Sequence, residues 1–159
     1  MVPVRHDPPV TDFNDFNRKV IDEFRQNEGQ VSGPFAGEIY RMPMAYPLRW
    51  PGGRDACAAE ALATVKSLIH TQVGEDNTAA LIIEPIQGEG GFIVPPPGWL
   101  RRVADWCREH GILLIADEIQ TGFGRTGRWF GFEDSGVSPD VVTLAKAMGN
   151  GMPVGACWA

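Results

Sequence analysis

Short apolar runs and stretches of helical periodicity alternate along the chain. Residues 79–83 (AALII) and 112–116 (ILLIA) are continuous apolar runs of strand length, as is typical of strands buried on both faces of a parallel sheet. Residues 141–144 (VVTL) form a third, shorter strand candidate. Apolar residues recur every three or four positions in residues 55–70 and 98–110, which predicts a helix in each segment. This alternation predicts an α/β fold with a mainly parallel sheet.

The first 37 residues follow a different pattern. Residues 1–10 are rich in proline and have no apolar period, so we expect a loose arm there. Helical spacing over residues 15–26 predicts an amphipathic helix. The segment 16–35, FNRKVIDEFRQNEGQVSGPF, resembles the N-terminal helix and turn of deazaflavin-dependent nitroreductases. We therefore expect residues 1–37 to be an arm and helix of different origin from residues 38–159.

The composition is that of an ordinary soluble protein, with 159 residues, 43% of them hydrophobic, and a net charge of −6. An acidic chain lacks the basic field that attracts phosphates, so we expect no nucleic-acid partner. The apolar runs are too short to cross a membrane. Three dispersed cysteines, Cys57, Cys107 and Cys157, have no histidine nearby at metal-ligand spacing, which argues against a metal site and favours a cytoplasmic location.

Charged residues follow each of the three predicted strands. Glu84 comes directly after the first strand, Asp117 directly after the second, and Lys146 two residues after the third. In parallel α/β sheets, ligands bind beyond the carboxyl ends of the strands. The sequence therefore predicts that these two acids and the lysine converge at one edge of the sheet.

The local sequence leaves the roles of Asp117 and Lys146 open. Lys146 has small, apolar neighbours, and a desolvated amine is nucleophilic, but a surface lysine with its stem lying along the protein is the alternative. Asp117 ends a very apolar strand, and a buried carboxylate needs a partner. A protonated heteroaromatic nitrogen would serve. So would a helix cap or an ion pair with Arg125 or Arg128.

Residues 122–127 spell GxGxxG shortly after a predicted strand. A dinucleotide-binding fingerprint needs a helix that opens on the glycines and an acidic residue about twenty positions later, at the end of a second strand. Residues 128–132 have no helical period. We therefore do not expect a dinucleotide site.

Three longer motifs occur in a characteristic order. They are EPIQGEGG at 84–91, ADEIQTGFGRTG at 116–127, and LAK at 144–146, which is followed by GMP at 151–153. Together these motifs resemble those of class-III aminotransferases, the pyridoxal-phosphate enzymes of the 4-aminobutyrate, ornithine and acetylornithine group. The resemblance implies that residues 38–159 are part of the pyridoxal-phosphate-binding large domain of a fold-type-I aminotransferase.

The resemblance implies four residues around the cofactor, pyridoxal 5'-phosphate. Lys146 would form the internal aldimine with it and then move a proton between the substrate carbon and the cofactor. Asp117 would pair with the pyridine nitrogen and keep it protonated, which lets the ring accept electrons. Ile119 would pack against the ring face, and Gln120 would hydrogen-bond the ring hydroxyl.

Glu84 and Glu89 would lie on the substrate side, where Glu89 pairs with a gating arginine in 4-aminobutyrate-type members. The implied reaction is ping-pong transamination, in a homodimer, between an amino acid or amine donor (4-aminobutyrate- or ornithine-like) and a 2-oxo acid acceptor.

Departures from the family pattern qualify this interpretation. We find no phosphate-binding loop or ring-stacking aromatic in residues 1–78, and the substrate-carboxylate arginine of the family belongs to a C-terminal domain. Asn150 stands where family members commonly have glycine. We therefore expect the isolated chain to be incomplete. The alternatives are a non-catalytic truncated remnant or interaction module and, more distantly, a deazaflavin-linked reductase.

Overall fold

The structure is a computed structural model, and it describes residues 38–159. By its internal contacts the chain divides into a unit of residues 1–41 and a unit of residues 42–159. Every helix and strand described below belongs to the second unit. The predicted N-terminal arm and helix, and the segment that resembles nitroreductases, lie outside the described residues.

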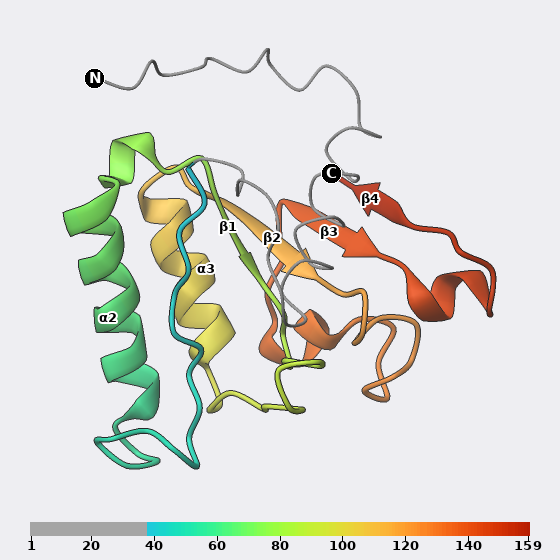
Figure 1. The fold of residues 1–159 in the computed structure, drawn as a ribbon, viewed down its shortest axis with the longest axis horizontal. Coiled ribbons are helices and arrows are strands. Elements are labelled where there is room, and N and C mark those ends of the chain that lie inside the picture. The colour runs from blue at the N-terminus through green and yellow to red at the C-terminus, as the bar shows by residue number, and fades with distance from the viewer. Residues whose placement is uncertain (1–37) are drawn as a thin grey trace, which may run out of the picture. The chain divides into compact units, whose positions relative to one another are not determined.

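Four strands form one sheet in the order β1-β2-β3-β4 (Figure 1). β1 (Ala80–Ile83), β2 (Leu113–Asp117) and β3 (Val141–Leu144) run parallel, as predicted, and each lies within one residue of its predicted bounds. β4 (Ala156–Trp158) pairs antiparallel with β3 and was not predicted. The sheet is thus mostly parallel, with one antiparallel edge strand.

Two helices, α2 (Cys57–Gln72) and α3 (Trp99–Glu109), lie side by side next to the sheet (Figure 1). Both were predicted from their apolar period. α3 connects β1 to β2, as the crossover between parallel strands requires. The apolar sides of both helices meet β2 in a core that includes buried side chains from α2 (Ala61, Val65, Ile69), from α3 (Trp99, Leu100, Val103, Cys107) and from β2 (Leu114).

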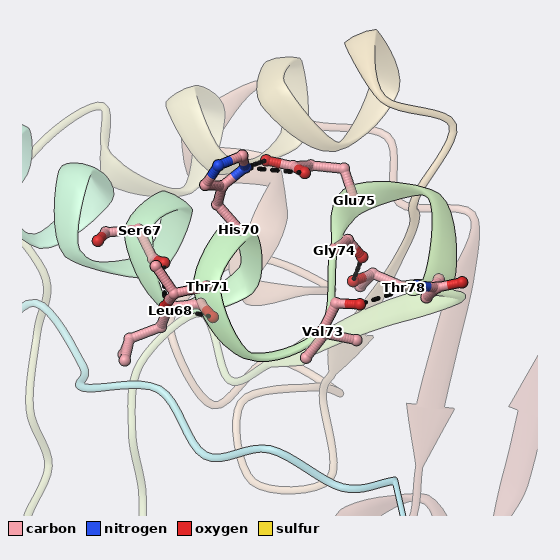
Figure 2. A network of polar contacts seen from close by, with 9 residues as sticks. Ser67, Leu68, His70, Thr71, Val73, Gly74, Glu75 and Thr78 are labelled. Carbon is pink, nitrogen blue, oxygen red and sulfur yellow. Dashed lines mark hydrogen bonds and ion pairs between the residues drawn. The ribbon is translucent and has the colours of Figure 1, made fainter.

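A network of polar contacts turns the chain at the end of α2 toward β1 (Figure 2). Gly74 has a φ of 85°, which glycine adopts without strain, and its N–H donates to the carbonyl of Ile69 at 2.7 Å. The Thr78 hydroxyl donates to the carbonyl of Gly74 at 2.9 Å, and Nδ1 of His70 lies 3.2 Å from Oε1 of Glu75 (Figure 2). The Gly74 N–H satisfies a carbonyl that the helix end leaves without an intrahelical partner, and the other two contacts hold the turn that follows.

The two helices cover only one face of the sheet. On the helix side, Leu114 is 3% exposed, and Ile83 packs against the same core. On the other side, Ile82 is 51% exposed and Leu113 is 49% exposed. The apolar runs predicted the strands correctly, but the expectation that both faces are buried is not met by residues 38–159, because α2 and α3 lie on the same side.

Candidate active site

The carboxyl ends of the parallel strands bring together side chains that are far apart in the sequence. Lys146 begins a 3₁₀ turn after β3, and its Nζ lies 3.3 Å from Oε1 of Glu89, which belongs to the loop after β1. The same Nζ contacts Oε1 of Gln120, in the loop after β2. The loops that follow all three parallel strands thus meet at Lys146. The side chains that contact its amine are Glu89 and Gln120, whereas the predicted acids Glu84 and Asp117 interact with Lys146 only through their charges.

The backbone at Lys146 is strained. Its φ of 45° lies in the left-handed region, which costs a residue other than glycine about 1–3 kcal/mol and persists only where the surroundings hold it. The side chain is 46% exposed, but two oxygen acceptors hold its amine. Lys146 therefore directs its amine at the loops after β1 and β2, with nearly half of its side chain exposed.

Asp117 ends β2 and is buried, with 6% of its surface exposed. Its Oδ1 accepts a hydrogen bond from the N–H of Ile119 at 3.0 Å, so the local-cap alternative is partly realised. Arg128 is paired with Asp134 at 3.0 Å instead. Burial raises the pKa of Asp117, while the Ile119 N–H, the Thr143 hydroxyl and the charge of Lys146 act in the opposite direction.

Thr143 is the neighbour of Asp117 on β3, in register with it. Paired residues of adjacent strands project to the same face of the sheet. The Thr143 hydroxyl is close enough to favour the charged form of Asp117, but it makes no hydrogen bond of standard geometry within residues 38–159 and is buried. Asp117 and Thr143 thus form a polar pair that is incompletely satisfied by the described residues.

Glu84, directly after β1, is half-buried, and its Oε2 accepts the N–H of Gly88 at 2.7 Å. Burial raises the pKa of Glu84, the Gly88 N–H opposes this, and the charge of Asp117 adds to it. A Cβ on Gly88 would lie 2.7 Å from Cγ of Gln120. The turn after β1 therefore packs directly against the side chain that contacts Lys146.

Sequence reasoning assigned no role to Glu118, which the structure buries completely. Its carboxylate accepts hydrogen bonds from the Thr121 hydroxyl and from the N–H groups of Gly131 and Phe132. A signal was present, because an acid directly after Asp117 in an extended chain points to the opposite side and into the protein. Its partners depend on how the following loop returns, which no local pattern shows.

The glycine-rich residues 122–127 form a turn, in which Gly124 and Gly127 have φ values of 85° and 90°. The next element is a short 3₁₀ helix, Gly131–Ser135, and no α-helix opens on the glycines. The segment therefore lacks the context of a dinucleotide fingerprint. Among residues 38–159 no cluster of three or more potential metal ligands occurs, and no helix there is long and apolar enough to cross a membrane.

Comparison with known proteins identifies the family. The aminotransferase class-III family matches residues 25–159. A 4-aminobutyrate aminotransferase of Mycobacterium leprae (strain TN) is 50% identical over 128 residues, which cover 78% of this chain and 28% of that protein. An acetylornithine aminotransferase of Methanopyrus kandleri is 57% identical over 82 residues, which cover 52% of this chain and 21% of that protein.

Solved structures agree in fold. An amine transaminase from an uncultivated Pseudomonas species, solved with pyridoxal phosphate bound, matches with a TM-score of 0.74 at 38% identity over 84% of this chain and 30% of its own. The chain therefore spans less than a third of the relatives it matches and contains part of the fold-type-I large domain. With its motifs, its sheet and its family match, the chain belongs to the class-III aminotransferases.

Proposed function

We propose that this chain carries the reactive lysine and the ring-binding aspartate of a pyridoxal-phosphate-dependent aminotransferase. The observation that carries the proposal is the meeting of Lys146, Gln120 and Glu89 at the sheet edge where the buried Asp117 ends β2. The reaction would transfer an amino group from a 4-aminobutyrate- or ornithine-like donor to a 2-oxo acid, in ping-pong order. As in the family, the intact enzyme would be a homodimer.

The residues present fit pyridoxal phosphate. Asp117 is a buried carboxylate with a raised pKa and a single backbone N–H donor, so a cationic group beside it would remove most of the cost of burying its charge. The unsatisfied Thr143 hydroxyl lies next to it. A protonated pyridine nitrogen supplies such a cation. When bound, the cofactor supplies an aldehyde that condenses with amines and a ring that accepts electrons.

Lys146 and the side chains around it would then have separate roles. The amine of Lys146 would be the nucleophile that holds the cofactor, and it would also serve as the base that moves a proton at the substrate carbon. Gln120 directs its amide oxygen at Lys146, which leaves the amide N–H₂ free to donate to the ring hydroxyl. Ile119 would pack on the ring face.

Glu84 and Glu89 are proposed for the substrate side of the site. The Glu89 side chain is 82% exposed and contacts Lys146 with one oxygen, so it is accessible to a cationic group such as an arginine. Glu84 is tied to its own turn through Gly88, so it would act by shaping that turn and by its negative charge.

Reductive trapping tests the proposal. The purified chain is incubated with pyridoxal phosphate, reduced with borohydride and digested, and the pyridoxyl group is mapped by mass spectrometry. We expect the label on Lys146, with Lys19 and Lys66 in the same chain as internal controls. Asp117→Asn should lower Lys146 labelling by about tenfold, the effect of losing one charge-assisted contact.

Two results would count against the proposal. Labelling spread evenly over the three lysines would indicate no organised site and would favour a non-catalytic remnant or interaction module. Equal labelling of Lys146 in the wild-type chain and in Asp117→Asn would show that Asp117 does not hold the ring. Glu133→Gln, which removes an exposed carboxylate from the 3₁₀ helix Gly131–Ser135, is the matched control and should label like the wild type.

A further inference from the structure

Glu118 is a completely buried carboxylate that the proposed chemistry does not use. Its Oε2 accepts the Thr121 hydroxyl at 2.6 Å and the Gly131 N–H at 2.9 Å, and its Oε1 accepts the Phe132 N–H at 2.8 Å. Its own N–H donates to the carbonyl of Thr143 at 3.0 Å. Glu118 is thus bound through its backbone to β3 and through its side chain to both ends of the loop that follows β2.

This carboxylate has no ion-pair partner among residues 38–159. A buried acid without a cation is unfavourable unless hydrogen bonds compensate it, and an apolar side chain of similar size often serves stability as well or better. All three of its donors come from one loop, at positions 121, 131 and 132. The bonds therefore define the path of that loop.

The return of the loop is also closely packed. A Cβ on Gly131 would lie 3.1 Å from Cβ of Thr121 and 3.3 Å from Cβ of Pro85, the residue after Glu84. The backbone at Gly131 therefore touches both the start of its own loop and the chain leaving β1. Glu118 thus links the residue after β2 to β3 and to the returning loop, and that loop lies against the chain that leaves β1.

We infer that Glu118 is a positioning residue for the candidate active site. Ile119 and Gln120 lie between two anchored positions, Glu118 and Thr121, so the carboxylate fixes where the Gln120 amide meets Nζ of Lys146. The importance of this for catalysis rests on the proposed function. The geometric inference, that Glu118 acts on Lys146 through Gln120, can be tested without cofactor.

The test is competitive acylation of the native chain with acetic anhydride. The rate at Lys146 is measured by mass spectrometry relative to Lys66 of the same molecule. An amine released from an acceptor is freer to attack, so Glu118→Gln should raise the relative rate at Lys146 by about fivefold, the effect of one typical hydrogen bond. Gln120→Ala should raise it to a similar extent, and Glu133→Gln should leave it unchanged.

The double variant separates positioning from general loosening. If Glu118 acts through Gln120, the double variant Glu118→Gln/Gln120→Ala should show the same relative acylation rate at Lys146 as Gln120→Ala alone. The effects of the two substitutions on this rate would then be strongly non-additive. Additive effects, or no change at Lys146 in Glu118→Gln, would overturn the inference. Thr121→Val removes one of the three donors at nearly constant volume, so it provides a milder variant if Glu118→Gln does not fold. It should give about a twofold rise.

The two proposals fail in distinguishable ways. If the wild-type chain does not label with pyridoxal phosphate, the proposed function fails for this chain, while acylation still decides whether Glu118 positions Gln120. If labelling succeeds and the double variant is additive, the function stands and the positioning role is wrong.

Discussion

Two adjacent acids at the end of β2 are both buried, but they receive different numbers of hydrogen bonds. Asp117 receives one backbone N–H, from Ile119, and its pKa is raised by burial. Glu118 receives three donors and has no exposed surface. Donors that bind the charged form compensate burial, and their number differs between the two. Glu118 therefore receives more hydrogen-bond donors than Asp117, which is consistent with the cation-binding role proposed for Asp117.

The raised pKa of Asp117 predicts a dependence of stability on pH. The folded chain binds this proton more tightly than the unfolded chain, so stability falls as pH rises from the ordinary carboxyl value, about 4, through the raised value. Above the raised pKa, the folded chain bears the full free-energy cost of burying the charged Asp117 carboxylate. Asp117→Asn removes the charge, so the variant without cofactor should resist urea better than the wild type near neutral pH.

The advantage of Asp117→Asn should disappear below about pH 4, where the aspartate is protonated in both states. Urea midpoints of both proteins across this range provide the measurement. A variant that is less stable than the wild type at neutral pH would show that the carboxylate is well satisfied without a ligand. The expected outcome, in which Asp117→Asn stabilises the chain but weakens cofactor binding, would be typical of a functional site.

For individual residues, the sequence predicted their position in the fold better than it predicted which side chains contact one another. Asp117 and Lys146 could be placed at one edge because strand ends of a parallel sheet must meet there. The contact of Gln120 with Lys146 could not be derived in this way, because it depends on the path of the loop after β2. That path is set by the buried bonds of Glu118 and by the close approach of Gly131 to Pro85, which involve residues distant in sequence.

At the scale of elements, the turn after β3 holds Lys146 in its strained conformation. The 3₁₀ turn Lys146–Gly149 begins at a residue with φ of 45° and is followed by Asn150 with φ of 46°. The left-handed residues Lys146 and Asn150 lie where the chain reverses its direction, so that β4 runs antiparallel to β3. β4 was not predicted because three residues carry no period, and its pairing depends on this turn.

Asn150 is expected to tolerate its conformation better than alanine would. Left-handed backbone costs an ordinary residue about 1–2 kcal/mol, which asparagine partly and glycine wholly avoids. Asn150→Ala should therefore lower the free energy of unfolding by about 1 kcal/mol relative to Asn150→Gly, as measured by urea denaturation. Equal stability of the two variants would show that the turn relaxes.

At the scale of the whole molecule, the sheet face opposite the helices exposes apolar side chains of β1 and β2. Ile82 and Leu113 are each about half exposed, and β1 is an edge strand of the sheet that residues 38–159 form. Apolar surface next to an unpaired edge favours association. Ile82→Lys should therefore reduce self-association of the chain, as measured by sedimentation velocity, with a change in unfolding free energy below about 1 kcal/mol.

The neighbouring residue provides the control. Leu81 points to the helix side and packs against the core, so Leu81→Lys should destabilise the chain by about 2 kcal/mol or more. If Ile82→Lys is equally destabilising, or if it leaves self-association unchanged, then the exposed face is not what drives association.

The wide sequence separation of the Lys146 contacts has a consequence for refolding. Gln120 lies 26 residues away and Glu89 lies 57 residues away, whereas the hydrogen bonds of α2 and α3 close within a few residues. Local structure forms early, while contacts that close long loops form late. During refolding, the helices should therefore appear before Lys146 acquires its neighbours. The reactivity of this one amine would report the completion of the sheet.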